Sequence, residues 1–308
     1  MGGAHPHGHG PGSATRAFAA VTLINLAYTV LEAGYGFAIN SLALLSDALH
    51  NLGDVLGLGL AWGAAVIAQR TPTERHTYGW RRATLLSPLA NSLLLVGFAG
   101  ALSWEALRRF GAPPQVPGLP VVVVASIGIA VNLGAAWLMR GGHAQDLNRR
   151  GAFLHLLADA AVSLAAVLAG AGMLVLGWDW LDPATALLVG VVVALGAFAL
   201  LRDAFNAAMD AVPAGVDPAA VREFLAGQAG VRAVHHLHIW SLGAGETAMT
   251  AHLVRPGHGD DHDAFIDMLV EALDRRFGIN HPTLQIELGD ACGHDRHDRA
   301  PHGGHDGR

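Results

Sequence analysis

Lysine is absent from the 308 residues, so the 19 basic side chains other than histidine are all arginines. Only 14% of the residues are charged, against about a quarter in a typical soluble domain. The single cysteine, Cys292, excludes a disulfide scaffold. The net charge of −6 gives no electrostatic reason to expect a nucleic-acid partner. With 52% hydrophobic residues and a mean hydropathy of +0.37, the composition indicates a membrane protein.

Six apolar runs are long enough to cross a bilayer, which takes about 20 mostly apolar residues per helix. They cover about residues 18–39, 42–68, 83–110, 116–139, 153–176 and 181–201. The first run follows a polar, histidine-containing tail and has no small-residue cleavage site, so a span is expected there rather than a cleavable signal peptide.

Arginine is distributed unevenly between the two ends of these runs. Arg108 and Arg109 lie at one end, where the other connections carry no arginine. Nine arginines lie at the opposite end: Arg16, Arg70, Arg75, Arg81, Arg82, Arg140, Arg149, Arg150 and Arg202. By the positive-inside rule, the sequence predicts a protein of the cell (inner) membrane with both termini in the cytoplasm.

The composition changes after about Asp210. Helices are predicted over about 217–228 and 263–277, a hairpin over 231–242 and 246–255, and a last strand over 283–288. This αββαβ order predicts a small α+β domain over residues 208–290, after a membrane domain over residues 14–207. Residues 1–13 and 291–308 are expected to form disordered tails, whose histidines either collect zinc weakly or only keep the tails soluble.

Two apolar runs contain histidine and aspartate four residues apart. His50 and Asp54 lie in the second run, and His155 and Asp159 lie in the fifth. On a helix this spacing puts both side chains on one face, about 5–6 Å apart at Cβ. If the two faces meet, two imidazoles and two carboxylates form a tetrahedral set that suits Zn²⁺. The alternative is hydrogen bonding between buried polar side chains, which explains one such pair more easily than two identical pairs.

Two further acidic residues lie in the apolar runs. Asp47, one turn before His50, is either a partner that fixes the tautomer of that imidazole or an interfacial cap. Glu32 in the first run is interpreted as an interhelical hydrogen bonder and as a candidate for a proton path.

The residues around the His/Asp pairs resemble the cation diffusion facilitator family. Residues 41–54 (SLALLSDALHNLGD) resemble its second helix, and residues 150–159 (RGAFLHLLAD) its fifth. Residues 180–183 (WLDP), 75–79 (RHTYG) and 234–240 (VHHLHIW) resemble its sixth helix, its helix 2–3 loop and the first strand of its cytoplasmic domain. The resemblance covers about residues 15–290 and is closest to the zinc-exporting branch.

The resemblance implies an α-helical membrane protein with six transmembrane helices and a cytoplasmic, ferredoxin-like, metallochaperone-like domain. It implies a homodimer in the lipid bilayer that exchanges cytoplasmic Zn²⁺ for protons by alternating access, and not an enzyme. By motif position the transport site is His50, Asp54, His155 and Asp159. The histidine at position 50, where members with a broader metal range have aspartate, implies a preference for zinc.

The resemblance also implies a zinc site in the cytoplasmic domain. His235 and His252 fall on ligand positions of the hairpin, and Glu287 falls on one in the last strand. His262 falls on a position that the family can use for a bridging ligand. Histidines on adjacent strands are able to approach one another as cross-strand neighbours. Solvated surface histidines without a metal are the alternative.

Other positions match the family less closely. His281 is a further candidate ligand, with a register uncertain by one residue, whereas His236 and His238 are interpreted as structural. In the helix 2–3 loop His76 remains, but Trp80 stands where a histidine ligand would be, so an intact third site is not expected there.

Arg82 and Asp210 are candidates for an opposite-charge pair that the family often has where the membrane domain meets the cytoplasmic domain. The alternative is two unrelated interfacial charges. Both residues lie at the ends of apolar runs on the predicted cytoplasmic side.

Four other functions are weighed against zinc/proton exchange. An intramembrane metalloprotease needs an open metal position and typically a His-Glu-x-x-His motif, which the sequence lacks. A passive divalent-metal channel and an exporter with a broader range (Cd²⁺, Co²⁺ or Fe²⁺) remain open, as does a receptor that binds zinc without moving it. A flux that saturates and needs a proton gradient distinguishes an antiporter from a channel.

Overall fold

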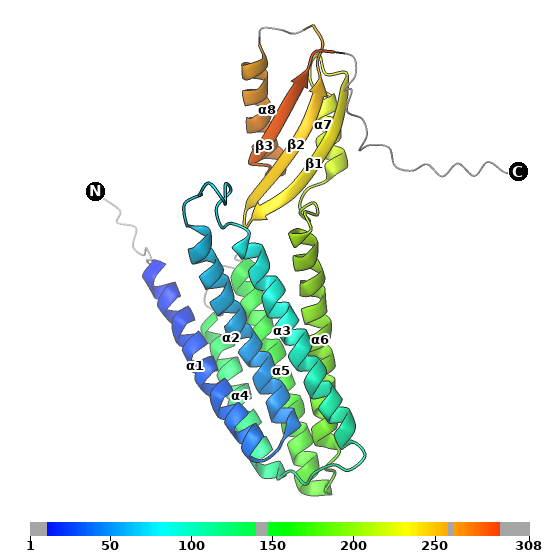
Figure 1. Ribbon diagram of the computed structural model, residues 1–308. Helices are drawn as coiled ribbons and strands as arrows, with labels where there is room; N and C mark the ends of the chain where they lie inside the picture. Colours follow the sequence, from blue (N-terminus) through cyan, green and yellow to red (C-terminus); the bar gives the residue numbers. More distant parts are fainter. Residues whose placement is uncertain (1–10, 140–146, 258–260, 290–308) are drawn as a thin grey trace, which may run out of the picture. The chain divides into compact units, whose positions relative to one another are not determined.

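The structure is a computed structural model that describes residues 11–139, 147–257 and 261–289. Six long helices come first: α1 (Pro11–Ala38), α2 (Leu42–Ala68), α3 (Ala83–Arg109), α4 (Gly118–Met139), α5 (Leu147–Leu176) and α6 (Leu181–Ala208) (Figure 1). The six predicted helices are thereby confirmed. Most of the two predicted tails, including Cys292, lies outside the described residues.

Two helices extend beyond the apolar runs that predict them. α1 begins at Pro11, within the predicted amino-terminal tail, and α5 begins at Leu147, before the predicted start at residue 153. Hydropathy marks only the part of a helix that suits lipid, whereas the backbone hydrogen bonds continue into the polar flanks.

Within the described residues, α2 to α6 are each long and apolar enough to cross a membrane, and α1 is a helix of 28 residues. Their outward surfaces are apolar: Phe37, Trp62 and Val175 expose 82%, 74% and 76% of their surface. Helices that are apolar all round and turn large side chains outward need lipid around them. The chain is therefore a multi-pass helical membrane protein.

The chain divides into two compact units. The helical unit comprises Met1–Leu60 and Ala90–Leu201, and the carboxy-terminal unit comprises Ala61–Leu89 and Arg202–Arg308. In the helical unit, the buried Asp182 at the start of α6 accepts hydrogen bonds from the Ser41 hydroxyl (2.6 Å) and the Leu42 N–H (2.8 Å). Inside a bilayer these amide and hydroxyl donors have no water molecules as hydrogen-bond partners, and Asp182 takes that role. The same bonds fix the start of α2 against α6.

Glycines allow the closest helix approaches of the helical unit. A Cβ at Gly118 of α4 would collide with the carbonyl oxygen of Gly170 on α5, and one at Gly128 would collide with the Tyr28 hydroxyl of α1. Small residues at helix contacts are typical of membrane bundles, in which packing replaces the hydrophobic drive. α5 is thus held firmly on α4, which sets the position of its His/Asp face.

The carboxy-terminal unit contains α7 (Pro218–Ala226), β1 (Ala233–Gly243), β2 (Glu246–Val254), α8 (His262–Phe277) and β3 (His281–Glu287). The predicted αββαβ order and the ferredoxin-like α+β class are confirmed. β1 and β2 are antiparallel, whereas β2 and β3 are parallel and joined through α8.

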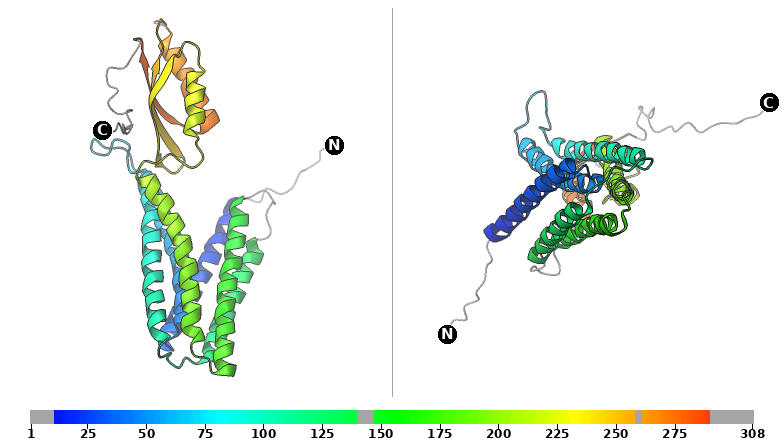
Figure 2. Two further views of the ribbon diagram at one scale, coloured as in Figure 1. Left: turned by 90° about the vertical axis from the view of Figure 1, so that its right-hand side faces the viewer. Right: turned by 90° about the horizontal axis from the view of Figure 1, so that it is seen from below.

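One face of this sheet is covered and the other is open. Met249, Ala251 and Leu253 of β2 are buried in a core shared with Leu225 of α7 and Leu269 of α8, and both helices lie on the same side of the sheet (Figure 2). Because side chains alternate along a strand, the residues between them face the open side. That face carries His252 on β2 and Glu287 on β3.

Candidate metal centres

The helical unit brings the four predicted transport residues together where α2 meets α5. His50 Nε2 of α2 lies 3.1 Å from Asp159 Oδ1 of α5. In the reverse direction, His155 Nε2 of α5 lies 3.2 Å from Asp54 Oδ2 of α2 and 3.7 Å from Asp159 Oδ2. Ligand atoms of His50, Asp54 and Asp159 all lie within 4.8 Å of one another. Each histidine of one helix thus faces a carboxylate of the other.

The four side chains form two levels of different exposure. Because α2 and α5 run in opposite directions, His50 is level with Asp159, and Asp54 is level with His155. The first pair is the less exposed, with exposed side-chain fractions of 20% for His50 and 1% for Asp159. The second pair is more open, with 30% for Asp54 and 48% for His155. A cation approaching from the exposed side meets Asp54 and His155 first.

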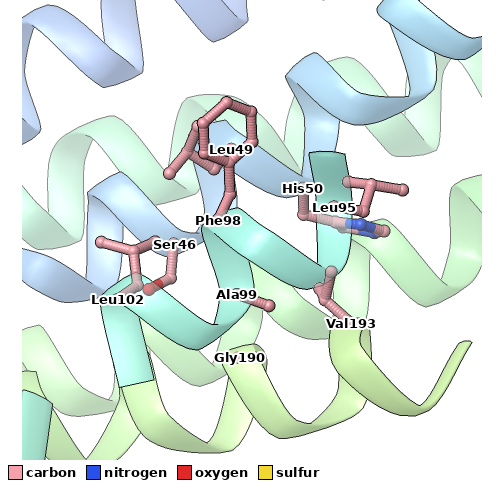
Figure 3. A pocket seen from close by; sticks show the side chains of 9 residues that line it. All are labelled: Ser46, Leu49, His50, Leu95, Phe98, Ala99, Leu102, Gly190 and Val193. Atoms are coloured by element: carbon pink, nitrogen blue, oxygen red, sulfur yellow. The ribbon is translucent and has the colours of Figure 1, made fainter. Parts of the chain in front are cut away.

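The other side of His50 is apolar (Figure 3). A small pocket between α2, α3 and α6 is lined by His50 together with Ser46, Leu49, Leu95, Phe98, Ala99, Leu102, Gly190 and Val193. Its volume of about 10 Å³ leaves room for about one water molecule. Apart from Ser46, whose buried hydroxyl makes no hydrogen bond within the described residues, the lining offers His50 hydrocarbon rather than further ligands.

A buried polar network lies beside this group. The Ser163 hydroxyl donates to Asp47 Oδ2 (2.8 Å), and the Tyr28 hydroxyl donates to Glu32 Oε1 (2.6 Å). The amide of Asn51 donates to Asp47 Oδ1 (3.4 Å) and Glu32 Oε2 (3.5 Å). Asp47 and Glu32 are fully buried, and the network joins α1, α2 and α5.

This network corrects the interpretation of Asp47. It lies inside α2 rather than at a helix end, so it is not an interfacial cap, and its hydrogen bonds go to Ser163 and Asn51 rather than to His50. Sequence reasoning missed Ser163, although a signal was present. Ser163 is four residues after Asp159, which puts both on one face of α5.

A second group of the same chemistry lies on the open face of the sheet. His235 Nε2 of β1 lies 3.1 Å from Glu287 Oε2, and His252 Nδ1 of β2 lies 2.9 Å from Glu287 Oε1. Ligand atoms of these three residues lie within 4.8 Å of one another. Three of the four residues predicted as cytoplasmic ligands are therefore neighbours, with His235 and His252 directly opposite in the strand pairing.

The other two histidine candidates are not part of this group. His262 begins α8, and neither of its buried ring nitrogens has a hydrogen-bond partner in the described part of the chain. His281 pairs with Ala248, at the opposite end of β3 from Glu287, because the strand register places Gln285 opposite His252. The length of β3 separates His281 from the three-residue group, so His281 is not a ligand of that group within one chain.

Charged side chains within the carboxy-terminal unit join the start of α3 to the end of α6 and to the sheet. Arg82 Nη2 donates to Asp210 Oδ1 (2.8 Å), the pair predicted from the sequence, and each side chain is 53% exposed. Arg81 pairs with Glu246 of β2, an ion pair that sequence reasoning missed. In the helix 2–3 loop, the ring of His76 stacks on Trp80 at 4.3 Å.

Two family models match the chain. Residues 18–207 match the cation efflux transmembrane domain, a range that includes most of α1. Residues 213–288 match the cytoplasmic domain of cation efflux proteins. Together they cover both the helices that carry the His/Asp group and the sheet that carries the second group.

Curated relatives match almost end to end. The metal cation efflux system protein CzcD of Cupriavidus metallidurans is 34% identical, over 94% of this chain and 91% of that protein. The zinc transporter ZitB of Escherichia coli is 35% identical, over 89% and 88%. A cadmium, cobalt and zinc/H(+)-K(+) antiporter of Bacillus velezensis is 32% identical, over 94% of each chain.

Proposed function

Since the chain belongs to the cation efflux, or cation diffusion facilitator, family of membrane transporters, we propose that it exports Zn²⁺ from the cytoplasm in exchange for protons. The proposed transport site is His50, Asp54, His155 and Asp159. The observation that carries this proposal is the cross-pairing of histidine and carboxylate between α2 and α5.

The distances between these ligands support a tetrahedral site. Zinc holds imidazole nitrogen and carboxylate oxygen at about 2.0–2.2 Å, so two ligand atoms of one tetrahedral zinc lie roughly 3.3 Å apart. The three N···O separations are 3.1, 3.2 and 3.7 Å. Small movements of the side chains are enough to place one ion among the four residues, with two nitrogens and two oxygens around it.

Protons and zinc compete for the same atoms. An imidazole nitrogen that faces a carboxylate at 3.1–3.2 Å shares a proton with it, whichever atom carries that proton. Zinc needs the lone pair of that nitrogen and the ionised carboxylate, so binding displaces protons from the site. Exchange then requires only that the site open alternately to the two sides of the membrane.

The difference in burial supports entry from the cytoplasm. With both termini cytoplasmic, Asp54 and His155 lie one helical turn nearer to the cytoplasm than His50 and Asp159, and they are the more exposed pair. An incoming ion is captured there and then passes to the buried pair. Movement of α5 against α2 would separate the ligands and release the ion on the other side.

We further propose the assembly that the family resemblance implies: a homodimer in the inner membrane, with both termini cytoplasmic. Residues 14–207 would form the transport domain and residues 208–290 the cytoplasmic domain. His235, His252 and Glu287 would hold a second Zn²⁺ that biases the access state, provided that zinc binds the two states with different affinity. His262 remains a candidate for a bridging ligand between protomers.

A broader metal range is the second candidate function. The Bacillus velezensis relative is named for cadmium and cobalt as well as zinc. Two imidazoles and two carboxylates also suit Co²⁺ and Cd²⁺, since the preference of such a site follows from its ligands and geometry rather than from one unique ion.

The test is a flux measurement in proteoliposomes with an acidic interior. Zn²⁺ added outside should enter with saturating kinetics and make the interior less acidic, because each ion exchanges for protons. Co²⁺ and Cd²⁺ in parallel samples separate a zinc exporter from one of broader range.

A matched pair of substitutions controls this test. Asp159→Asn keeps the shape of the buried side chain but removes its charge, and should abolish both signals. Asp203→Asn makes the same change at an exposed aspartate of α6 that pairs with Arg202, and should leave both unchanged. Zinc entry that is linear in concentration and moves no protons would identify a channel instead.

A further inference from the structure

His236 departs from the strand geometry that the sequence predicts. Neighbouring residues of a strand point to opposite faces, so His236 should face away from His235. Instead, the pairing of β1 with β2 shifts between His235 and His238, and His236 has a φ of +51°. A left-handed backbone at a residue other than glycine costs about 1–2 kcal/mol. Such bulges re-aim side chains and are frequent at functional sites.

The bulge brings three imidazole rings to mutual contact. The ring centroids are 5.1 Å apart for His235 and His236, 5.2 Å for His235 and His252, and 4.9 Å for His236 and His252. By contrast, the centroid of His238, two residues further along β1, lies 6.5 Å from that of His236. The three rings therefore form a nearly equilateral triangle, which Glu287 joins through His235 and His252.

The size of this triangle matches one tetrahedral ion. A zinc–nitrogen distance of about 2.0–2.1 Å puts an imidazole centroid roughly 3.2 Å from the metal, and the tetrahedral angle then separates two centroids by roughly 5.2 Å. The three observed separations lie within 0.3 Å of that value. The two histidines of the transport site, at 6.1 Å, do not match as closely.

One ring nitrogen of this triangle has no other partner. Within the described residues, the buried Nε2 of His236 makes no hydrogen bond, whereas His235 Nε2 and His252 Nδ1 face Glu287. A buried polar atom without a partner costs free energy, and an ion is one explanation for it. The residues therefore fit a metal.

We propose that His236 is a fourth ligand of the cytoplasmic site, which completes a His₃Glu set for Zn²⁺ with His235, His252 and Glu287. His236 is not part of the three-residue group whose ligand atoms lie within 4.8 Å of one another, so rotation of its ring closes the set. Four protein ligands complete the tetrahedral shell of a zinc ion, and here all four come from one hydrogen-bonded sheet, whose strands do not separate as the two helices of the transport site are able to. The cytoplasmic zinc is therefore retained as a structural or sensing ion and is not an intermediate in transport.

This inference rests on the proposed cytoplasmic site, and the experiment separates the two. Full-length protein with Asp54→Ala and Asp159→Ala, which disable the transport site, is titrated with Zn²⁺ against a chelating dye. His236→Gly removes the imidazole and accepts the left-handed backbone. His236→Asn also removes the imidazole, and asparagine tolerates the left-handed backbone better than most residues other than glycine. His238→Ala removes an exposed imidazole from the same strand as a control.

Loss of one ligand should weaken the tightest Zn²⁺ binding at least about tenfold in both His236 variants. Their metal-free melting temperature should stay the same or rise, because strain is relieved. Co²⁺ bound in place of Zn²⁺ should show weaker visible absorption as water replaces the imidazole. His238→Ala should change none of these quantities.

Unchanged Zn²⁺ affinity in either folded His236 variant overturns the fourth ligand, as does an equal loss in His238→Ala. His235→Ala and Glu287→Ala report on the underlying site. If they weaken binding while His236→Gly does not, only the present inference fails. If they too have no effect, the proposed cytoplasmic site itself is wrong.

Discussion

The proposed transport site and the proposed cytoplasmic site, called here the transport group (His50, Asp54, His155 and Asp159) and the cytoplasmic group (His235, His252 and Glu287), use the same types of side chain on different scaffolds. In the membrane, the ligands come from α2 and α5, and each histidine faces a carboxylate across the helix contact. In the cytoplasmic domain, the ligands come from three strands of one hydrogen-bonded sheet. Two helices are able to separate and divide their ligand set, whereas a sheet holds its ligands together. The first scaffold suits capture and release of an ion, and the second suits retention.

The largest expected effect tests this division of roles directly. Asp159→Ala removes a carboxylate with 1% exposure that both histidines of the transport group approach. We expect Zn²⁺ flux to fall by about a hundredfold or more, since loss of a buried charged ligand costs several kcal/mol. Flux is measured in proteoliposomes at saturating Zn²⁺.

Glu287→Ala is the matched carboxylate removal in the other group. It should leave the maximal flux within about twofold, because the sheet site is not on the ion's path in this account. Equal losses in the two variants would contradict the contrast between release and retention.

The next effect is the dependence of zinc binding on pH. A protonated imidazole has no lone pair to offer, so acidifying the cytoplasmic side should raise the Zn²⁺ concentration that gives half-maximal flux. At pH values where the ligands are protonated, each further drop of one pH unit should weaken Zn²⁺ binding about tenfold for every proton displaced. Stability of the zinc complex is thus gained as pH rises and lost as it falls.

The two groups should differ in the steepness of this dependence. The transport group contains two histidines, whereas the cytoplasmic group contains three if His236 is a ligand. Zinc binding to variants with only one functional group, titrated at several pH values, gives the number of protons displaced by each. A cytoplasmic group that displaces as many protons in the His236→Gly variant as with His236 present would argue against a third imidazole.

The transport group was the more predictable of the two because its signal is local. The spacing of His50 and Asp54, repeated in His155 and Asp159, defines one helix face whatever the tertiary packing. This spacing does not show which carboxylate faces each histidine. Each histidine pairs with the carboxylate of the other helix because α2 and α5 make an antiparallel contact. The hydrogen bond between Ser163 and Asp47 has the same origin.

The cytoplasmic group was less predictable because its geometry depends on strand register. The opposition of His235 and His252 follows from the hairpin, and the family resemblance indicated Glu287. A period-two pattern assigns His236 to the opposite face of the strand from His235, and nothing in a single sequence marks a bulge at a non-glycine residue. His281 was a candidate until the parallel register of β2 and β3 placed it at the opposite strand end.

A smaller effect tests whether the cytoplasmic group communicates with transport. The triple variant His235→Ala, His252→Ala, Glu287→Ala should shift the Zn²⁺ concentration for half-maximal flux by a few-fold, within the range of typical allosteric couplings of about 1–3 kcal/mol. The maximal flux should change little. Flux measured across a range of Zn²⁺ concentrations, with His238→Ala as control, decides this. An unchanged concentration dependence would remove any regulatory role.

The smallest effect is expected at the junction residues Arg82 and Asp210. Both side chains are about half exposed, and an ion pair in that setting contributes less than about 1 kcal/mol to stability. Arg82→Ala should therefore leave the melting temperature nearly unchanged. The same substitution at Arg255, which is 4% exposed, bonded to Asp261 and stacked over Phe265, should destabilise the cytoplasmic domain by about 2 kcal/mol or more. Arg82→Ala could instead abolish the effect of the cytoplasmic group on the Zn²⁺ concentration for half-maximal flux. Communication between the two groups would then depend on this one ion pair.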